Sequence, residues 1–114
     1  VIINISSRTA FGPQRKNGPY AAAKAATNSL TETLSVELAP KIRVNAVAPG
    51  PVPTQNFQES TGISEEQVPA MEKNLGIPLQ RFGKVEDIGA AVVFIASPAA
   101  SWITGQCLYV TGGM

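Results

Sequence analysis

Residues 1–24 read VIINISSRTAFGPQRKNGPYAAAK, and this stretch decides the fold. Its first five residues are apolar and mostly β-branched, a pattern typical of a strand buried on both faces, as in a parallel sheet. A loop rich in Ser, Gly, Pro and charged residues follows over 6–18, and Pro19 then stands where the first turn of a helix tolerates a missing N–H. The stretch therefore predicts a buried strand, a loop at its carboxyl end and the start of a long helix.

The rest of the chain continues this alternation. The predicted elements after the first strand are, in order, a helix over 20–39, a strand over 42–48, a helix over 85–96 and a strand over 106–110. Pro40 ends the first helix, and three prolines within 49–53 stop the second strand. Strands that alternate with helices in this way predict a parallel sheet with helices on both faces.

The helix over 20–39 has two distinct faces. Leu30, Leu34 and Leu38 recur at a spacing of four residues, so we expect this stripe to pack against the sheet. Another face carries only small residues, which would allow a second helix to approach closely and could serve as a subunit interface. Its members are Ala22, Ala26, Ser29 and Thr33.

Residues 55–80 are polar and irregular, with a short helix predicted over 64–75. Ser64 and Gln67 have the spacing of a capping box at the start of that helix. A segment of this length inside a compact domain is more typical of a binding loop than of a spacer, so we interpret 55–80 as a substrate lid loop.

A strand buried on both faces also needs neighbours on each side, and the chain has too few strands to supply them. We therefore expect a piece of a longer domain.

Composition excludes several classes of function. The 114 residues contain 9 Lys and Arg against 8 Asp and Glu, a net charge of +1 that gives no basic footprint for nucleic acid or an anionic membrane. No apolar run is long enough to span a bilayer. The absence of His excludes a His-based triad and an imidazole-rich metal site, so no metal is expected. A single cysteine, Cys107, favours a reducing cytoplasm.

Tyr20 and Lys24 are the most informative pair. Residues four apart on a helix lie one above the other, and both would emerge near the carboxyl end of the first strand, where open α/β sheets bind ligands. A phenol has a pKa of about 10 and is a poor acid or base at neutral pH, but an ammonium one turn away favours the phenolate. Taken alone the spacing is weak evidence, because a tyrosine at a helix start beside a solvated lysine is common.

Ser7 strengthens the case because it follows the first strand directly, thirteen residues before Tyr20. A hydroxyl opposite an ionisable phenol is the arrangement that polarises a carbonyl and moves its proton. The simpler alternative is that Ser6 and Ser7 only turn the chain out of the strand. One of the two is expected to do no more than that.

Five motifs resemble, in order, the second half of a short-chain dehydrogenase/reductase. They are NISS at 4–7, YAAAK at 20–24, RVNAVAPG at 43–50, RFGKVEDI at 81–88 and ITGQ at 103–106. The resemblance implies the C-terminal part of a Rossmann-like, doubly wound parallel sheet of about three strands, two long helices and a lid loop. Residues 1–114 would then be the catalytic half of a domain whose N-terminal cofactor-binding half is absent.

The resemblance also implies a role for each matching residue. Tyr20 would be the catalytic acid/base, Lys24 its partner and a ligand of the nicotinamide ribose, and Ser7 would bind the substrate oxygen. Cofactor-binding positions would be Tyr20, Lys24, Pro49, Gly50, Val52 and Thr54, with the Val52 backbone at the carboxamide and the Thr54 hydroxyl at the carboxamide or pyrophosphate. Without the family, Pro49-Gly50 would be interpreted as an ordinary strand-ending turn. Asn45 is assigned a structural role.

The remaining residues receive structural expectations. Five apolar residues of the 55–80 segment are candidates to line a substrate pocket or simply to pack the loop: Phe57, Val68, Met71, Leu75 and Ile77. Trp102 and Cys107 are interpreted as core or interface, and Arg81 as a brace between the lid and the following helix. Thr111 stands where the family usually has an acidic residue, which leaves any salt bridge there in doubt.

The implied activity is hydride transfer between NAD or NADP, which this half cannot distinguish, and a small-molecule ketone or secondary alcohol. The implied assembly is a homodimer or homotetramer, and the fragment alone is expected to be inactive because the glycine turn, the ribose selector and a relay Asn would all precede residue 1. The alternatives are a non-catalytic dinucleotide-binding sensor or scaffold, and a dehydratase or epimerase built on the same site.

Overall fold

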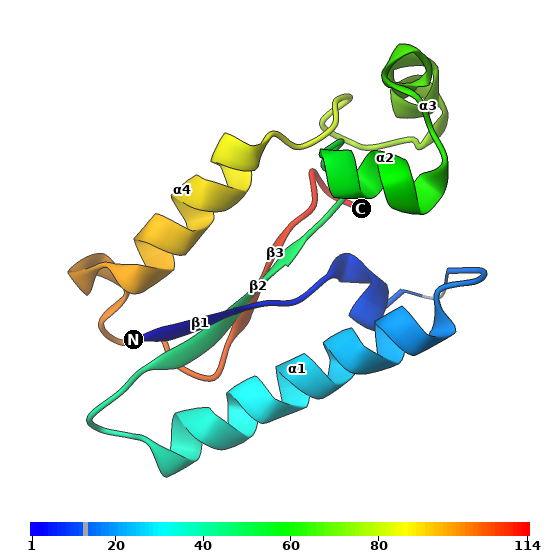
Figure 1. Cartoon of the computed structure of the whole chain (residues 1–114). Coiled ribbons are helices and arrows are strands. Elements are labelled where there is room, and N and C mark those ends of the chain that lie inside the picture. Colours follow the sequence, from blue (N-terminus) through cyan, green and yellow to red (C-terminus); the bar gives the residue numbers. More distant parts are fainter. Residues whose placement is uncertain (13) are drawn as a thin grey trace.

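The computed structural model describes residues 1–12 and 14–114, so the predicted loop over 6–18 is described on both sides of residue 13. Within these residues a parallel sheet is built from β1 (Ile2–Ile5), β2 (Val44–Pro49) and β3 (Cys107–Val110), in the order β1-β2-β3. Its register places Ile2 beside Val44 and Ala46 beside Cys107. The helices α1 (Gly18–Glu37) and α4 (Val85–Ala96) cover opposite faces of the sheet (Figure 1). The predicted alternation and the two-sided covering are confirmed.

The core is centred on β2, not on β1. Val44, Ala46, Val47 and Ala48 of β2 are fully buried, because this strand has a neighbour on each side and a helix on each face. In contrast, Ile2 is 36% and Ile5 47% exposed. The strand predicted over 1–5 is present, but within the described residues β1 is paired on one side only, so the predicted burial on both faces is not seen there.

The face that α1 turns toward the sheet is also different from the predicted one. Leu30 is 53% exposed and Leu34 and Leu38 are half-buried, whereas Asn28, Thr31 and Ser35 are buried. These short polar side chains let the helix approach the strands closely. The amide of Asn4 donates to the Thr31 hydroxyl at 2.9 Å, and a Cβ on Gly105 would lie only 2.7 Å from Ser35 Oγ. The predicted small-residue face of α1 is exposed, as an interface would require, but no second chain is described.

Arg43 and Asn45 tie β2 to the far end of α4. The Arg43 guanidinium donates to the carbonyl oxygens of Ile95 and Ile103, at 3.0 and 3.1 Å, and to two further carbonyls at 3.3 Å. It thereby satisfies backbone acceptors that a helix leaves unpaired at its carboxyl end. The buried Asn45 side chain donates to Ile103 O and accepts from the Gln106 N–H, which agrees with its expected structural role.

The short helices lie at the carboxyl ends of the strands. They are η1 (Arg8–Ala10), α2 (Gln55–Thr61), η2 (Glu65–Gln67) and α3 (Val68–Asn74), with η3 (Pro98–Ala100) after α4 at the other end. The helix predicted over 64–75 is present as η2 and α3, and the Ser64 N–H donates to Gln67 Oε1 at 3.0 Å as the capping spacing suggested. The helix α2 was not predicted. It begins at the cap residue Thr54 and ends at Gly62, whose φ of +70° suits glycine.

No helix of the described residues combines the length and the apolar character needed to cross a bilayer.

Candidate active site

A cavity of about 510 Å³ opens at the carboxyl ends of β1 and β2, beneath α2 and α3. Ser7 lines it from the end of β1, Tyr20 from the first turn of α1, and Pro49 and Gly50 from the end of β2. Residues far apart in the sequence meet here because parallel strands end at the same edge of a sheet, where the chain leaves each strand for a helix. The predicted convergence of Ser7 and Tyr20 on one opening is observed in the structure.

Ser7 is held with its hydroxyl oxygen already engaged. Ser7 caps η1, and its Oγ accepts hydrogen bonds from the backbone N–H of Thr9 at 3.2 Å and from the Thr9 hydroxyl at 2.9 Å. A hydroxyl has two lone pairs and one proton, so these two bonds leave the Ser7 proton for a partner outside the loop. Ser6 is buried and donates to Lys24 O at 3.3 Å, so Ser6 is the serine that only shapes the backbone.

Tyr20 and Lys24 occupy successive turns of α1. Tyr20 is 49% exposed and faces the cavity, so its phenol is not part of the core. The Lys24 ammonium lies 5.7 Å from the centre of the Tyr20 ring and donates to Ile5 O at 2.8 Å. Lys24 does not itself line the cavity. It stands one turn behind Tyr20 and links α1 to the end of β1.

The turn after β2 requires a glycine. The Gly50 N–H donates to Val110 O at 2.9 Å, which holds this turn against the end of β3. A Cβ at Gly50 would lie 2.8 Å from Thr111 Cα, a distance that backbone atoms cannot relieve by rotation. The close approach gives the cavity a floor of bare backbone between Pro49 and Pro51.

Besides Lys24, two further predicted cofactor positions lie outside this cavity. Val52 is half-buried and packs toward Gly83, where a Cβ would lie 3.0 Å from Val52 Cγ2. Thr54 is exposed, and its Oγ1 accepts the Phe57 N–H at 3.3 Å as the cap of α2. The family resemblance implied a cofactor contact for the Thr54 hydroxyl. In the structure this hydroxyl caps α2.

The 55–80 segment contributes three of its five predicted apolar residues. Phe57, Met71 and Leu75 line the cavity, so for these the pocket interpretation agrees with the structure. Val68 and Ile77 do not line it, and for them the loop-packing alternative holds. Ile77 is 4% exposed because it packs where Gly112 leaves room, with Ile77 Cγ2 only 2.8 Å from the position of a Cβ.

Most of the polar lining was missed by sequence reasoning. It consists of Arg8, Thr9, Gln14, Asn17, Asn56, Ser60 and Thr61. None belongs to a motif, and their side chains meet only when the loop after β1 and the helix α2 come together. The one available signal was position, because Arg8 and Thr9 directly follow Ser7 at the end of the strand.

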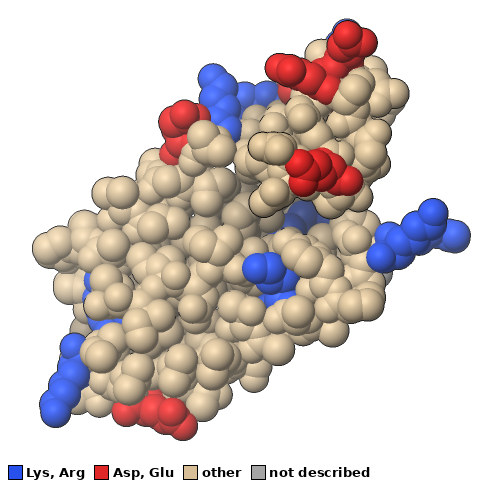
Figure 2. All heavy atoms as spheres, viewed as in Figure 1, with Lys and Arg blue, Asp and Glu red and all other residues tan. Residues whose placement is uncertain are grey.

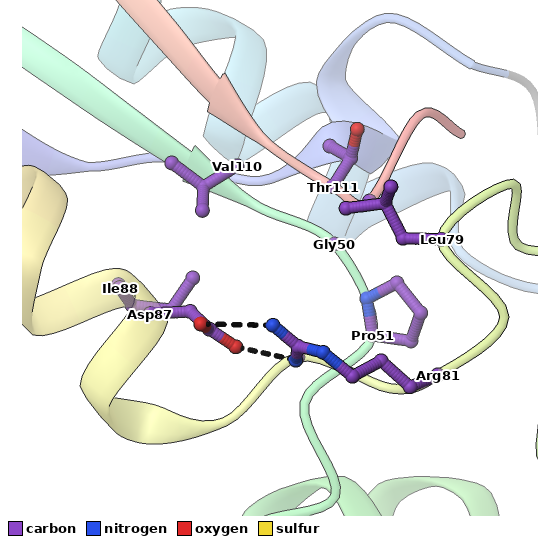
Figure 3. Close-up of a pocket in the computed structure, with 10 residues that line it drawn as sticks. Gly50, Pro51, Leu79, Arg81, Asp87, Ile88, Val110 and Thr111 are labelled. Atoms are coloured by element: carbon purple, nitrogen blue, oxygen red, sulfur yellow. Dashed lines mark hydrogen bonds and ion pairs between the residues drawn. The ribbon is translucent and has the colours of Figure 1, made fainter.

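A second, smaller cavity of about 200 Å³ lies on the other side of Gly50 and Pro51 (Figure 3). Arg81 points across it to Asp87 near the start of α4 and makes a paired contact, with N–O distances of 2.7 and 3.1 Å (Figure 3). The hydrogen bond from Arg81, and then that from the Lys84 N–H, lower the pKa of Asp87 from 3.8 to about 2. Arg81 also donates to Phe82 O, so it braces the end of the lid against α4 as predicted.

The expectations for Trp102 and Cys107 are only partly met. Trp102 is 99% exposed, so its assignment to the core is wrong for the described residues and only the interface alternative remains. Cys107 lies half-buried on β3 with its Sγ 3.6 Å from Asn28 Oδ1. Burial raises the pKa of the Cys107 thiol, with a smaller contribution from Glu32, which disfavours the reactive thiolate. Thr111 donates to Met114 O at 3.2 Å in place of any salt bridge.

Comparison with known proteins agrees with this geometry. The family model described as "Enoyl-(Acyl carrier protein) reductase" matches residues 1–114. Short-chain dehydrogenase/reductase SDRA of Arabidopsis thaliana is 45% identical over 113 residues, which cover 99% of this chain and 43% of that protein.

Solved structures share the fold of this chain. An NADPH-bound short chain oxidoreductase from Pseudomonas aeruginosa PAO1, described as containing an atypical catalytic center, superposes with a TM-score of 0.89 at 30% identity, covering 99% of this chain and 45% of that one. A 7α-hydroxysteroid dehydrogenase complexed with NADH and 7-oxo glycochenodeoxycholic acid gives 0.85 at 36% identity, covering 98% and 43%. The chain belongs to the short-chain dehydrogenase/reductase family, and it spans less than half the length of these relatives.

Proposed function

We propose that the protein containing this chain transfers a hydride between a nicotinamide dinucleotide and a small ketone or secondary alcohol. The observation that carries the proposal is the cavity itself, in which the Ser7 hydroxyl, the Tyr20 phenol and the bare backbone at Gly50 face the same space. The NADPH-bound and NADH-bound relatives support a nicotinamide cofactor of either kind. When bound, that cofactor would supply or accept the hydride at the substrate carbon.

The residues of the chain fit such a cofactor. The close approach of Gly50 to Thr111 leaves a floor without side-chain atoms, on which a flat ring could lie. Lys24 has three ammonium protons, and in the described residues only one is used, in the bond to Ile5 O. The other two are available for ribose hydroxyls. We propose Pro49, Gly50, Val52 and Thr54 as the remaining contacts on the nicotinamide side.

In the reducing direction, Tyr20 gives the proton of its phenol to the substrate oxygen as the hydride reaches the carbon. The Ser7 hydroxyl donates a hydrogen bond to the same oxygen and stabilises the charge that develops on it. The positive charge of Lys24 behind Tyr20 stabilises the phenolate that remains. In the oxidising direction the phenolate accepts the proton of the alcohol. In the reducing direction a C–H bond and an O–H bond form on the substrate while the O–H bond of Tyr20 breaks, and in the oxidising direction these changes are reversed.

The test is substitution of Tyr20 by Phe in the whole protein, which keeps the ring and removes the proton. Positioned general acid–base groups contribute about 10²- to 10⁴-fold, so we expect a loss of that order in kcat. Tyr109→Phe is the matched control, because Tyr109 is similarly exposed on β3 and does not line the cavity. Activity of Tyr20→Phe near the level of Tyr109→Phe would contradict the proposal.

We also propose a domain organisation, an assembly and a location for the whole protein. Residues 1–114 would form the catalytic half of a larger domain, with 55–80 as its substrate lid, and the isolated half would neither bind the cofactor tightly nor turn over. The exposed small face of α1 supports a homodimer or homotetramer, which native mass spectrometry of the whole protein would measure. A cytoplasmic location is consistent with the single cysteine, and fractionation of the cells would test it.

A further inference from the structure

The cavity that holds Ser7 and Tyr20 has a charged side chain in its wall. Of the side chains that line it, that of Arg8 is the only Lys, Arg, Asp or Glu side chain, and the others are neutral polar or apolar. The carboxylates of the overhanging helices, Glu59 on α2 and Glu72 on α3, do not line it. Figure 2 shows atoms of Lys or Arg in the hollow below this overhanging segment, whereas the nearby Asp or Glu atoms lie on the outer surface of the segment. Among the described residues, the lining of the cavity therefore has one cationic side chain and no Asp or Glu side chain.

Within residues 1–12 and 14–114, no ion-pair partner of Arg8 is found. Among the described residues the only ion pair is Arg81 with Asp87, and the Arg8 guanidinium donates no hydrogen bond. Arg8 is half-buried, and its guanidinium rests beside Gly12, where a Cβ would lie 3.4 Å from one of its nitrogens. Glycine at that position leaves the guanidinium room to lie close to the loop. Arg8 is thus a half-buried residue whose guanidinium lies against the loop and makes no ion pair within the described part of the chain.

This arrangement differs from that of the other described arginines near strand ends. Arg81 is fully engaged with Asp87, and Arg43 with four carbonyl oxygens. A half-buried guanidinium favours an anionic partner, and its planar fork matches the two oxygens of a carboxylate or the oxygens of a phosphate. Arg8 also follows Ser7 directly, so their Cα atoms are about 3.8 Å apart. Because both residues line the same cavity, an anion bound by Arg8 would share that cavity with the oxygen that Ser7 contacts.

We propose that Arg8 binds an anionic oxyacid group of the substrate, so that the protein acts on a ketone or alcohol that also carries a carboxylate or a phosphate. This inference rests on the proposed hydride transfer for its reaction and on Arg8 for its specificity. The apolar residues Phe57, Met71 and Leu75 line the same cavity and would contact the hydrocarbon part of the molecule. Arg8 is thus a specificity-determining residue beside the reacting groups.

The experiment uses the whole protein with NADH or NADPH and a series of oxo acids of increasing chain length. Each oxo acid is paired with its uncharged methyl ester, and a parallel series replaces the carboxylate by a phosphate. The variants are Arg8→Gln, which removes the charge, and Arg8→Lys, which keeps the charge without the fork. Arg15→Gln is the matched control, because Arg15 is exposed in the same loop and does not line the cavity.

We expect the wild type to prefer an acid or a phosphate to the matched ester in kcat/KM. Hydrogen bonds to charged groups are worth enough that Arg8→Gln should lower kcat/KM for the anionic substrate by about 10- to 100-fold. Activity on the ester should fall much less than activity on the acid, and an unchanged thermal unfolding curve shows that the variant is folded. Arg8→Lys should retain part of the preference, and Arg15→Gln all of it. The carboxylate and phosphate series show which oxyacid the site takes.

Two outcomes would overturn the proposal: a wild type without preference for the anion, or an Arg8→Gln variant that loses acid and ester activity equally. Calorimetric titration measures binding of the hydroxy acid or oxo acid without turnover, and it therefore tests the anion site separately from the proposed reaction. If no substrate is turned over but the acid binds wild type more tightly than Arg8→Gln, the anion site stands and the hydride-transfer proposal fails. If substrates react but the charge of Arg8 makes no difference, only the present inference fails.

Discussion

Substitution of Gly50 by Ala tests the closest backbone contact of the site. The added Cβ would lie 2.8 Å from Thr111 Cα and 3.2 Å from both Thr111 Cβ and Thr111 O. These atoms belong to the chain at the end of β3, and the bond from Gly50 N to Val110 O at 2.9 Å prevents the two strands from separating locally. Relief must come from a shift of the backbone, and overpacking of this kind costs about 1 to 3 kcal/mol.

The free energy of unfolding of the whole protein, measured in urea, is the appropriate assay. Gly89→Ala is the matched control, because Gly89 lies inside α4 and a Cβ there would meet no atom within 4 Å. Alanine is the better helix former, so Gly89→Ala should stabilise the protein by about 0.5 to 1 kcal/mol. The same added methyl group is thus expected to have opposite effects at the two positions.

The refuting result is a Gly50→Ala protein at least as stable as the wild type. It would mean that the turn after β2 can move away from Thr111 without cost, and that the floor of the cavity is not fixed by this contact. Because Gly50 lines the cavity, we also expect Gly50→Ala to weaken binding of the nicotinamide nucleotide. A stability loss with unchanged nucleotide affinity would place the cofactor elsewhere.

Three other predictions address the supports of the site. Arg43→Met should lower the free energy of unfolding by about 2 kcal/mol, because four carbonyl oxygens lose a charged donor. Arg43→Lys should recover part of this loss, and equal stability of the wild type and both variants would contradict the prediction. Folding lowers the pKa of Asp87 from 3.8 to about 2, so its ion pair with Arg81 stabilises the fold above pH 3.8 and is lost as the pH falls through 2. Asp87→Asn should therefore lose less stability than the wild type over that interval in acid-denaturation curves, and parallel curves would refute the assignment. Thr9→Val removes the hydroxyl that donates to Ser7 Oγ and should lower kcat by a larger factor than it raises KM. Thr9→Ser keeps a hydroxyl and should retain the wild-type kcat. An unchanged kcat in Thr9→Val would show that Ser7 needs no such support.

The sequence by itself determined the order and kind of the main elements. Apolar runs and the turn residues that end them predicted the three strands, and the spacing of apolar residues predicted α4 over the residues that it occupies. The capping spacing of Ser64 and Gln67 predicted the start of the helical turns before α3. Ser7 and Tyr20 could be placed in one site because parallel strands release the chain at a common edge. These features depend on local chemistry or on a general rule of topology, and both are legible along the chain.

Only the tertiary structure decided which surfaces those elements bury and which side chains meet. Leu30 and its neighbours made the stronger apolar stripe, yet α1 buries Thr31 and Ser35 because close approach to the sheet requires short side chains with partners on the strands. The sequence offered only the position of Arg8 directly after Ser7, since its place in the cavity becomes evident only when the loop after β1 lies beneath α2 and α3. The spacing of apolar residues along the chain indicates whether a segment is a helix or a strand. Which side chains are buried or paired depends on residues that are distant in the sequence and that the fold brings into contact with the segment.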